Sequence, residues 1–377
     1  MAGGFLRRFT KTIFVLSNVI IAVLFLLGCY ASWFDPTKFW FIGFLTLASF
    51  YLLLALIVFI IFWLFAKKKF IFISLLAIGL AWKPIGQLIK FVKPNNFKLA
   101  KQPDILRVMS WNVEHFDILE YKTRPQVKTQ MLDLISMYQP DVACFQEMVG
   151  SDFDSTAINY IPYFGERLHF PYNFYSYNKK DDFDDKHHFG IIIYSKYPII
   201  ERHTIRYDPL TYNSTFQYVD IVKGNDTIRV FNFHLQSLRF SHENLNFINN
   251  PTTDGEIDLK ESRNVISKLK RGFLQRNLQS DRIKKAMNES PYPLIACGDF
   301  NDVPNSYAYN TIGSGLNNAF AEKGSGIGRT FSSISPTLRI DNIFMDKKFE
   351  VENYIRIKKK MSDHFPIIAD LKIEEVK

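Results

Sequence analysis

The chain has 377 residues and a formal net charge of +9, and its length allows two or three domains. The charge is uneven, because residues 1–101 carry a net charge of +11 and the remaining residues carry −2. A basic isoelectric point usually indicates a nucleic-acid binder. Here the excess basic residues flank apolar segments, and the rest of the chain gives no global electrostatic support for DNA binding.

Two apolar runs near the amino terminus are long enough to cross a membrane. Residues 12–31 and 39–66 contain few polar side chains, and about 20 apolar residues in a helix cross a hydrocarbon core. A short polar break with Asp35 and Pro36 separates the runs. The pattern predicts a helical hairpin.

A third run, over residues 70–90, is less regular. Phe70–Trp82 is apolar but only 13 residues long, which is too short to span alone, and Lys83 and Pro84 then interrupt the apolar pattern. The run either spans with a lysine snorkelling to the surface or lies in the membrane interface. We therefore predict a transmembrane anchor of two to three helices over residues 1–101.

The third run decides the predicted membrane orientation. Basic residues gather before the first run and after the second, and such clusters favour the cytoplasm. A third crossing places the rest of the chain outside, whereas a re-entrant segment keeps it inside. We favour three spans, and therefore an integral protein of the inner or plasma membrane with residues 102–377 in an extracytoplasmic position. The clusters are Arg7, Arg8 and Lys11, and Lys67 to Lys69.

A cleaved signal is the alternative reading of the first run. Its basic start and apolar stretch are similar to a signal peptide, and LLGC, ending at Cys29, resembles a lipoprotein cleavage site. The run is long for a signal and a longer run comes directly after it, so an anchor is favoured. The other two cysteines, Cys144 and Cys297, lie in apolar runs and are expected to be buried thiols.

From Ile105 onward the pattern changes to short strands. Runs of β-branched and aromatic residues end in Asn, Asp, Gly or Pro, which is typical of strands, and helical periodicity covers residues 123–138 and 258–287. This mixture predicts one α/β domain with layered sheets over residues 102–377. The expected strands are ILRVMSW, DVACFQE, FGIIIYS, TIRVFNFHL, YPLIACGDF, IDNIFM and HFPIIADL.

Chemically capable polar residues stand at the ends of these strands. One such residue is often only a turn-former, but carboxylates, amides and two imidazoles recur at strand after strand. The set is Asn112, Glu147, His234, Asp299, Asn301, Asp341, Asp363 and His364.

This set suits metal-assisted hydrolysis of a phosphate ester. Mg²⁺ prefers oxygen ligands, which Glu147 can supply, and Asp299 can take the proton of an attacking water. His234 and His364 can donate to the oxygens of the charged transition state. Asp341 is the carboxylate expected behind a buried imidazolium.

The motifs resemble those of the endonuclease/exonuclease/phosphatase superfamily, which includes pancreatic-type deoxyribonucleases, abasic-site endonucleases, inositol-polyphosphate 5-phosphatases and neutral sphingomyelinases. In family order, residues 104–377 carry SWNV, FQE, FHLQ, GDFND, RIDNIF and SDHFP. GDFN and SDHFP at this separation are the specific part of the pattern. The resemblance implies a four-layer α/β sandwich (DNase-I-like), with two packed mixed sheets flanked by helices and the site at one end.

The resemblance also implies a metal site for Mg²⁺ or Mn²⁺. Glu147 resembles the metal-binding glutamate of the family. Asn112 would lie near the metal or the phosphate, and Asp363 is similar to an aspartate near the metal.

The remaining motif residues resemble the family's catalytic groups. Asp299 and Asn301 look like the pair that activates and orients water. Asp341 and His364 resemble the paired aspartate and histidine. His234 resembles the histidine of the deoxyribonuclease and sphingomyelinase branches, which makes the abasic-site branch less fitting.

Two stretches fit the family pattern less clearly. His187 and His188 precede FGIIIYSKYP, where some branches place a charged residue that faces the site. His188 is the candidate substrate contact, although exposure beside the acidic run Asp181–Asp185 is the favoured reading. Residues 239–261 are long, polar and without a family motif, so they form either a substrate loop or a surface insertion.

The leading hypothesis is a membrane-anchored, Mg²⁺- or Mn²⁺-dependent hydrolase of a phosphodiester or phosphomonoester, in which water activated by Asp299 attacks in line. Its partners would be the lipid bilayer and a phosphate-ester substrate, either nucleic acid, phospholipid or a small phosphoester. One alternative is a sphingomyelinase-type phospholipid headgroup hydrolase. The other is a catalytically silent binding module on a membrane anchor, which the full set of site residues disfavours.

Overall fold

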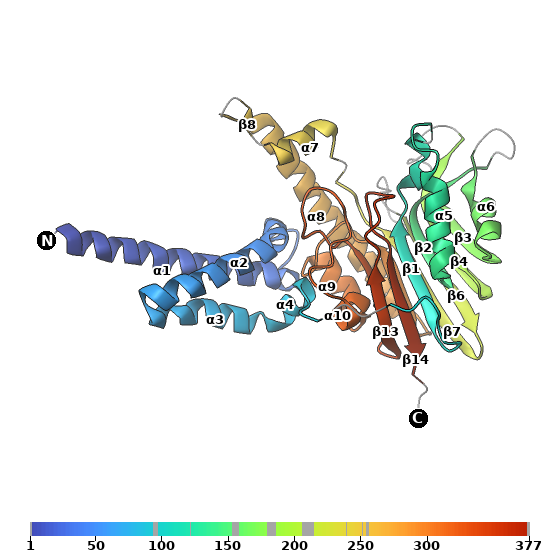
Figure 1. Cartoon of the computed structure of the whole chain (residues 1–377), viewed down its shortest axis with the longest axis horizontal. Coiled ribbons are helices and arrows are strands. Elements are labelled where there is room, and N and C mark those ends of the chain that lie inside the picture. Colours follow the sequence, from blue (N-terminus) through green and yellow to red (C-terminus); the bar gives the residue numbers. More distant parts are fainter. Residues whose placement is uncertain are drawn as a thin grey trace.

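A bundle of helices projects from one side of a layered α/β domain, with the amino terminus at the far end of the bundle (Figure 1). The computed structural model describes residues 2–92, 97–120, 122–152, 158–178, 186–205, 215–238, 240–250, 252–253 and 256–374.

The bundle is built from the apolar runs at the amino terminus. Its helices are α1 (Ala2–Cys29), α2 (Ile42–Ala66), α3 (Ile71–Leu80) and α4 (Trp82–Leu88), with 3₁₀ turns at Ala31–Trp33 and Lys68–Phe70. The segments Arg7–Cys29 and Ile42–Ala66 are long and apolar enough to cross a membrane. The hydroxyl of Ser74 donates to Asn18 Oδ1 at 2.8 Å, which ties α3 to α1, as polar side chains do between membrane helices.

The third apolar run is broken between α3 and α4, whose axes differ by 70°. Pro84 accounts for the break, because proline has no N–H and its ring excludes the carbonyl four residues earlier. That carbonyl belongs to Leu80, and it accepts a hydrogen bond from the Tyr30 hydroxyl instead. A broken span and a re-entrant segment both fit this shape, so the third crossing stays a prediction.

The α/β domain contains two six-stranded mixed sheets. The first has the order β13-β14-β1-β2-β4-β3 and the second β11-β12-β10-β7-β6-β5. The strands of the first sheet are β13 (Phe349–Arg356), β14 (Ile367–Ile373), β1 (Leu106–Asn112), β2 (Val142–Gly150), β4 (His188–Ser195) and β3 (Tyr172–Tyr177). Those of the second are β11 (Asn317–Asn318), β12 (Asp341–Met345), β10 (Leu294–Asp299), β7 (Asp226–His234), β6 (Thr215–Lys223) and β5 (Ile199–Ile205).

Three apolar cores separate four layers. The middle core lies between the sheets and contains Val108 and Cys144 from the first and Cys297 from the second. An outer core joins the first sheet to α5 (Val127–Tyr138) and α6 (Tyr160–Arg167). The other joins the second sheet to α8 (Leu259–Asn288) and α9 (Tyr307–Gly313). The expected four-layer sandwich is therefore confirmed, and both cysteines are buried thiols.

The described part of the domain also contains five shorter elements: the 3₁₀ turn η3 (Glu114–Glu120), α10 (Ala319–Lys323), α7 (His242–Asn249) and the paired strands β8 (Thr252–Thr253) and β9 (Glu256–Ile257). The polar stretch 239–261 thus contains a helix. Ser241 and Asn244 form a reciprocal capping box at its start, and Lys268 of α8 donates to Asn244.

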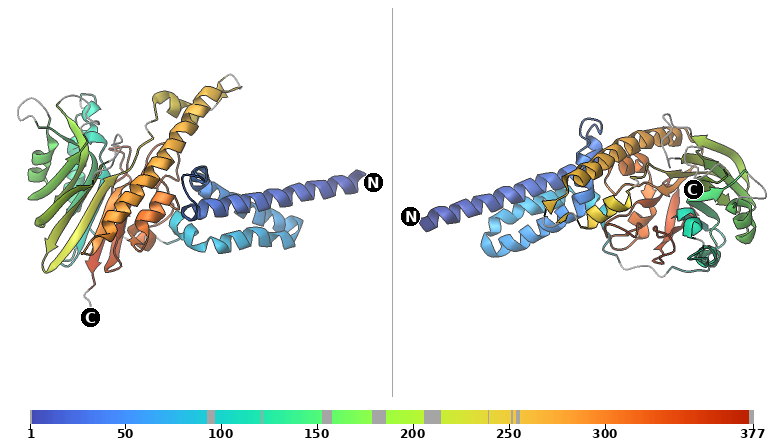
Figure 2. Two further views of the ribbon diagram at one scale, coloured as in Figure 1. Left: turned by 180° about the vertical axis from the view of Figure 1, so that it is seen from behind. Right: turned by 90° about the horizontal axis from the view of Figure 1, so that it is seen from above.

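The bundle is held against the domain by polar contacts. Asn305 donates to the Pro84 carbonyl at 3.3 Å, and Tyr51 of α2 lies 2.9 Å from Ser335 through their hydroxyls. Lys90 and Gly326 form an isolated β-bridge. The views in Figure 2 agree that the bundle leaves from the side of the domain where α8 and α9 lie.

Candidate active site

The strand register gathers most candidate residues at one end of the sandwich. In the second sheet, Asp299 at the end of β10 pairs with His234 at the end of parallel β7 and with Asp341 at the start of antiparallel β12. In the first sheet, β1 ends at Asn112 beside parallel β2. The carboxyl ends of parallel strands share one sheet edge, and the middle core stacks these two edges over each other.

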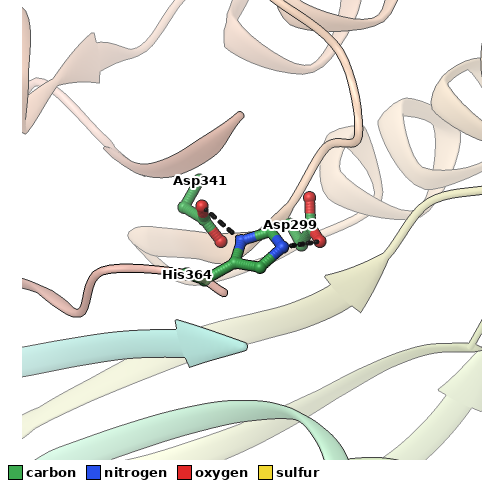
Figure 3. A group of neighbouring side chains, drawn as sticks. All are labelled: Asp299, Asp341 and His364. Carbon is green, nitrogen blue, oxygen red and sulfur yellow. Dashed lines mark hydrogen bonds and ion pairs between the residues drawn. The ribbon is translucent and has the colours of Figure 1, made fainter. Parts of the chain in front are cut away.

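His364 lies between two aspartates. Its Nδ1 donates to Asp341 Oδ2 at 2.8 Å, and its Nε2 lies 3.6 Å from Asp299 Oδ2, as Figure 3 shows. The loop before β14 is fixed locally, because Trp111 donates to the His364 carbonyl at 2.9 Å. The three side chains form a line along which a proton or a positive charge can be held.

The pKa values of His364 and Asp299 are both raised by their surroundings. Burial opposes the charge on His364, but Asp341, Asp299 and Asp363 outweigh it and raise its pKa well above the usual range. Burial, with Asp341 adding repulsion, raises the pKa of Asp299 to about 6 against the attraction of His364. An acid with a pKa near neutrality is suited to take a proton from water.

Asn112 joins the two halves of the site. Its Nδ2 lies 3.1 Å from Glu147 Oε1 and 3.1 Å from Asp299 Oδ2. Glu147 has a φ of +57° where the β2–β4 register shifts between Phe145 and Met148. Such a bulge re-aims a side chain, and it turns Glu147 toward the end of the sandwich.

His234 brings an unsatisfied ring nitrogen to the same place. Its Nε2 is buried and has no hydrogen-bond partner among the residues that the structure describes, and it lies 3.6 Å from Asp299 Oδ2 and 3.9 Å from Glu147 Oε1. A buried polar atom without a partner is costly. This nitrogen is therefore positioned for a group that binds between the two carboxylates.

Glu114 lies in the candidate site, although the sequence motifs did not single it out. Its carboxylate accepts a hydrogen bond from the backbone N–H of Asp363 at 2.8 Å. Burial and the nearby Asp363 raise the pKa of Glu114 to about 7, and burial also raises the pKa of Asp363. Glu114 stands two residues after Asn112 in SWNVEHF, but no pattern in the sequence distinguished it from a turn residue.

His115 was missed for the same reason. Its Nε2 lies 3.5 Å from Glu147 Oε2, and its ring packs edge-on against Phe189 at 4.2 Å. Burial opposes ionisation of Glu147, but His115, His234 and the Asn112 amide lower its pKa overall. Glu147 is therefore held as a carboxylate.

Asn301 and His188 occupy less central positions. The Asn301 backbone N–H donates to Asp299 Oδ1 at 2.7 Å, and its side chain donates to the Leu235 carbonyl at 3.0 Å. His188 is buried, in contrast to the favoured exposed reading. It is stacked on Tyr177 at 4.1 Å, with Nε2 3.0 Å from Asp152. A role for His188 in substrate contact stays a prediction.

Two groups of side chains compete as a cation site. Asp299, Asp341 and His364 offer ligand atoms within 4.8 Å of one another. The Nδ1–H of His364 donates to Asp341, so Nδ1 cannot coordinate, and a cation at this group would be bound through His364 Nε2 and Asp299. Glu114, Glu147 and Asp363, which we call the acidic group, offer only oxygens, and mutual repulsion contributes to the raised pKa values of Glu114 and Asp363. A cation would relieve that repulsion.

Residues 109–364 match the model of the Endonuclease/Exonuclease/phosphatase family. The chain belongs to this family. Residues 11–88 match a separate domain of unknown function, DUF8431. No curated protein matches the chain. Family membership and the buried Asp/His group make the α/β domain a phosphoesterase fold of a type that is mostly metal-dependent.

Solved structures share the fold at low sequence identity. A family member from Bacteroides thetaiotaomicron is 17% identical, covers 73% of this chain and 100% of its own, and has a TM-score of 0.52. Humanized D. rerio TDP2 is 17% identical, with 71% and 99% covered and a TM-score of 0.51. A family protein from Beutenbergia cavernae is 15% identical, with 72% of both chains covered and a TM-score of 0.50. These likenesses concern the fold.

Proposed function

We propose that the chain is a membrane-anchored phosphoesterase that uses Mg²⁺ or Mn²⁺ to hydrolyse a phosphodiester or phosphomonoester by in-line attack of water. One observation carries the proposal. Asp299 Oδ2 lies 3.1 Å from Asn112 Nδ2 and 3.6 Å from the Nε2 atoms of both His234 and His364. The three nitrogen atoms can donate to the oxygens of an anion, and the carboxylate can accept a hydrogen bond from a water. An anion and a water can therefore be held together at this point.

The acidic group, with Asn112, would hold the metal. Its oxygens suit a hard cation, and Asp363 stands next to His364, so a metal there would adjoin the proton-transfer line. When bound, Mg²⁺ neutralises charge on the phosphate and polarises its phosphorus–oxygen bonds. Glu114 is an addition to the ligand set that the sequence motifs suggested.

The other residues would act on water and phosphate. Asp299 accepts the proton of the attacking water, and the backbone N–H of Asn301 holds the opposite carboxylate oxygen in place. His364, kept protonated by Asp341, places positive charge where the phosphate oxygens gain negative charge. His234 supplies the second donor from the neighbouring strand.

We also propose that residues 1–101 form the anchor and residues 102–377 the catalytic domain, outside the cytoplasm. Arg7, Arg8 and Lys11 line a single surface hollow with Lys67 and the aromatic residues before it. Both basic clusters therefore lie at one end of the bundle, and the domain lies at the other (Figure 1). Because basic clusters favour the cytoplasm, this arrangement supports three crossings.

The proposal is tested with the full chain purified in detergent. Hydrolysis of bis-p-nitrophenyl phosphate is measured first, followed by hydrolysis of DNA, RNA, phospholipid and inositol phosphates. We expect activity with Mg²⁺ or Mn²⁺ that EDTA abolishes. Asp299→Asn and His364→Ala should each lose about 10² to 10⁴-fold in kcat, with unchanged folding by circular dichroism. The enzyme proposal fails if the folded wild-type chain hydrolyses none of these phosphoesters with either metal, which would favour a silent binding module.

A further inference from the structure

One face of the 30-residue helix α8 is turned toward the side of the domain from which the helical bundle projects. Positions spaced three and four apart share one face of a helix. A stripe along this face consists of Leu259, Arg263, Ile266, Lys270 and Phe273, and we call it the α8 stripe.

The carboxyl-terminal part of the α8 stripe touches the bundle. The Phe273 ring packs edge-on against Phe44 at 5.4 Å, and it lies so close to Gly43 that a Cβ there would be 2.6 Å from the ring. Lys270 Nζ lies 4.6 Å from the centre of the Trp40 ring. The stripe therefore meets the bundle where α2 begins.

The amino-terminal part of the α8 stripe continues past the bundle. Ile266 is 48% exposed and Leu259 is 67% exposed, and with a rise of about 1.5 Å per residue Leu259 lies some 21 Å from Phe273 along the helix. In Figures 1 and 2 the amino-terminal end of α8 leans toward the side from which the bundle projects. Two large apolar side chains thus face this side of the domain next to the bundle.

Other faces of α8 have different neighbours. Val265 and Arg276 are buried against the α/β domain, and Lys268 donates to Asn244 of α7. Asn264 is exposed on a face turned away from Ile266. The exposure of Ile266 therefore belongs to the side of the helix that carries the bundle contacts.

Aromatic residues mark the level of a membrane surface at the same place. The segment between α1 and α2 carries Trp33, which is 78% exposed, together with the exposed rings of Phe39 and Phe41. Aromatic side chains, tryptophan and tyrosine above all, gather where a membrane protein crosses the headgroup region. The contact between Phe273 and the start of α2 is therefore at this level.

We propose that the α8 stripe lies on the surface of the bilayer that holds the bundle. Leu259 and Ile266 enter the boundary between headgroups and acyl chains, and Arg263 and Lys270, interleaved with them on the same face, contact lipid phosphates. The inference rests on the proposed anchoring, and it adds a second, peripheral contact between domain and membrane.

This contact would fix the active site relative to the membrane. Arg276, three residues beyond Phe273, pairs with Asp302 at 3.1 Å and donates to the Gln236 carbonyl at 3.1 Å. Asp302 comes directly after Asn301, and Gln236 lies two residues after His234 at the end of β7. On another side of the site, the backbone N–H of Ser332 donates to the Asp363 carbonyl, and Ser335 in the same loop contacts Tyr51 of α2.

The test uses the full chain, reconstituted in vesicles of phosphatidylethanolamine and phosphatidylglycerol. Ile266→Cys and, as the matched control on the far face, Asn264→Cys are labelled with a nitrobenzoxadiazole fluorophore. The three native cysteines are buried, so the label reports the introduced thiol. We expect a blue shift and a several-fold intensity gain at position 266, quenched by lipids carrying a nitroxide on the acyl chain, and neither effect at position 264.

Two results would overturn the proposal. One is a water-like spectrum at position 266 in a labelled protein that stays in the membrane after alkaline extraction. The other is a blue-shifted probe that nitroxide lipids do not quench, which would indicate a protein partner or a second copy. Failure of the anchoring itself is distinguished from both, because the chain would then leave the vesicles on alkaline extraction.

A second variant keeps the test independent of labelling. In a chain that carries Arg263→Cys, adding Leu259→Asp and Ile266→Asp should make the introduced thiol react several-fold faster with a membrane-impermeant maleimide, because the stripe would leave the lipid. Adding only Asn264→Asp to the Arg263→Cys chain should leave the rate unchanged. Equal rates in the two variants would contradict a lipid contact.

Discussion

His364 owes its charge to its neighbours. Buried imidazoles are normally neutral, because burial opposes the charged form, and here three aspartates reverse that preference. Asp341 is the partner in direct contact, at 2.8 Å. It fixes both the orientation of the ring and the position of its proton, so its effect on catalysis should pass through His364.

Changing Asp341 to asparagine tests this dependence. Asp341→Asn keeps the shape of the side chain but removes the negative charge, so His364 should lose its proton more readily. We expect kcat on bis-p-nitrophenyl phosphate to fall by about 10²-fold or more, with a smaller change in KM. Asp346→Asn, in the turn after β12, is the control. A wild-type kcat in Asp341→Asn would contradict the assigned role.

Substitution of Glu114 tests whether this residue belongs to the metal site formed by the acidic group. Glu114→Gln preserves the size of the side chain and removes one charge from a cluster that we expect to bind the cation. The Mg²⁺ concentration for half-maximal activity should rise by about 10 to 100-fold, and calorimetric titration should show weaker binding. Glu166→Gln on the exposed part of α6 serves as the matched control. An unchanged Mg²⁺ requirement would remove Glu114 from the metal site.

At the level of elements, β1 is tied to its neighbours by a buried ion pair. Arg107 in β1 contacts Asp370 of β14 at 2.7 and 3.0 Å, and it donates to the Tyr138 carbonyl at the end of α5. The guanidinium is fully buried. Removing one partner leaves the other charged and buried, which is costly.

We therefore expect Asp370→Asn to destabilise the chain strongly. Loss of one partner in a buried pair costs about 3–5 kcal/mol, visible as a lower midpoint in chemical unfolding of the full chain in detergent. Arg124→Leu removes a pair with Asp117 in which the arginine side chain is 47% exposed, and it should cost less than about 1 kcal/mol. Similar losses in the two variants would contradict this account.

Burial explains part of the outcome of the strand prediction. The seven expected runs correspond to β1, β2, β4, β7, β10, β12 and β14, which are buried over most of their length. The strands β3, β6 and β13 were not expected, although most of β6 is buried. The strand β5 was not expected either, and its central residues 200–204 are exposed at the sheet edge. An edge strand lacks the continuous apolar run of a central strand, so composition alone gives it little signal.

At the scale of the whole molecule, the domain is attached to the end of the helical bundle opposite the basic clusters. Both basic clusters lie at one end of the bundle, and contacts from Pro84 and Tyr51 hold the other end to the domain. This geometry leads to the expectation that the domain faces away from the cytoplasm.

A reporter at the carboxyl terminus tests this orientation. A fused reporter that is active only outside the cytoplasm should be active on the full chain, and one that fluoresces only in the cytoplasm should be dark. Ending the chain after residue 67, before the third apolar run, should reverse both signals and is the control. The opposite pattern in the full chain would indicate that α3 and α4 re-enter the membrane without crossing it.

The sequence alone determined the family, the layered fold and the identity of most candidate residues. Motif order is a local property, and strand ends such as that of Asp299 follow directly from apolar runs and turn residues. Two apolar helices of spanning length are equally local, because length and composition define them. Glu114, the acidic residue of SWNVEHF, was visible too, but no pattern distinguished it from a turn residue.

Only the tertiary structure decided how these residues meet. Strand register placed Asp299 beside His234 and Asp341, and sheet stacking brought Asn112 within reach of both Glu147 and Asp299. The pKa values depend on burial and on charges far apart in the chain. The position of α8 against the bundle also rests on long-range packing, because Phe273 and Phe44 are 229 positions apart in the sequence. Local pattern carries no information about such contacts.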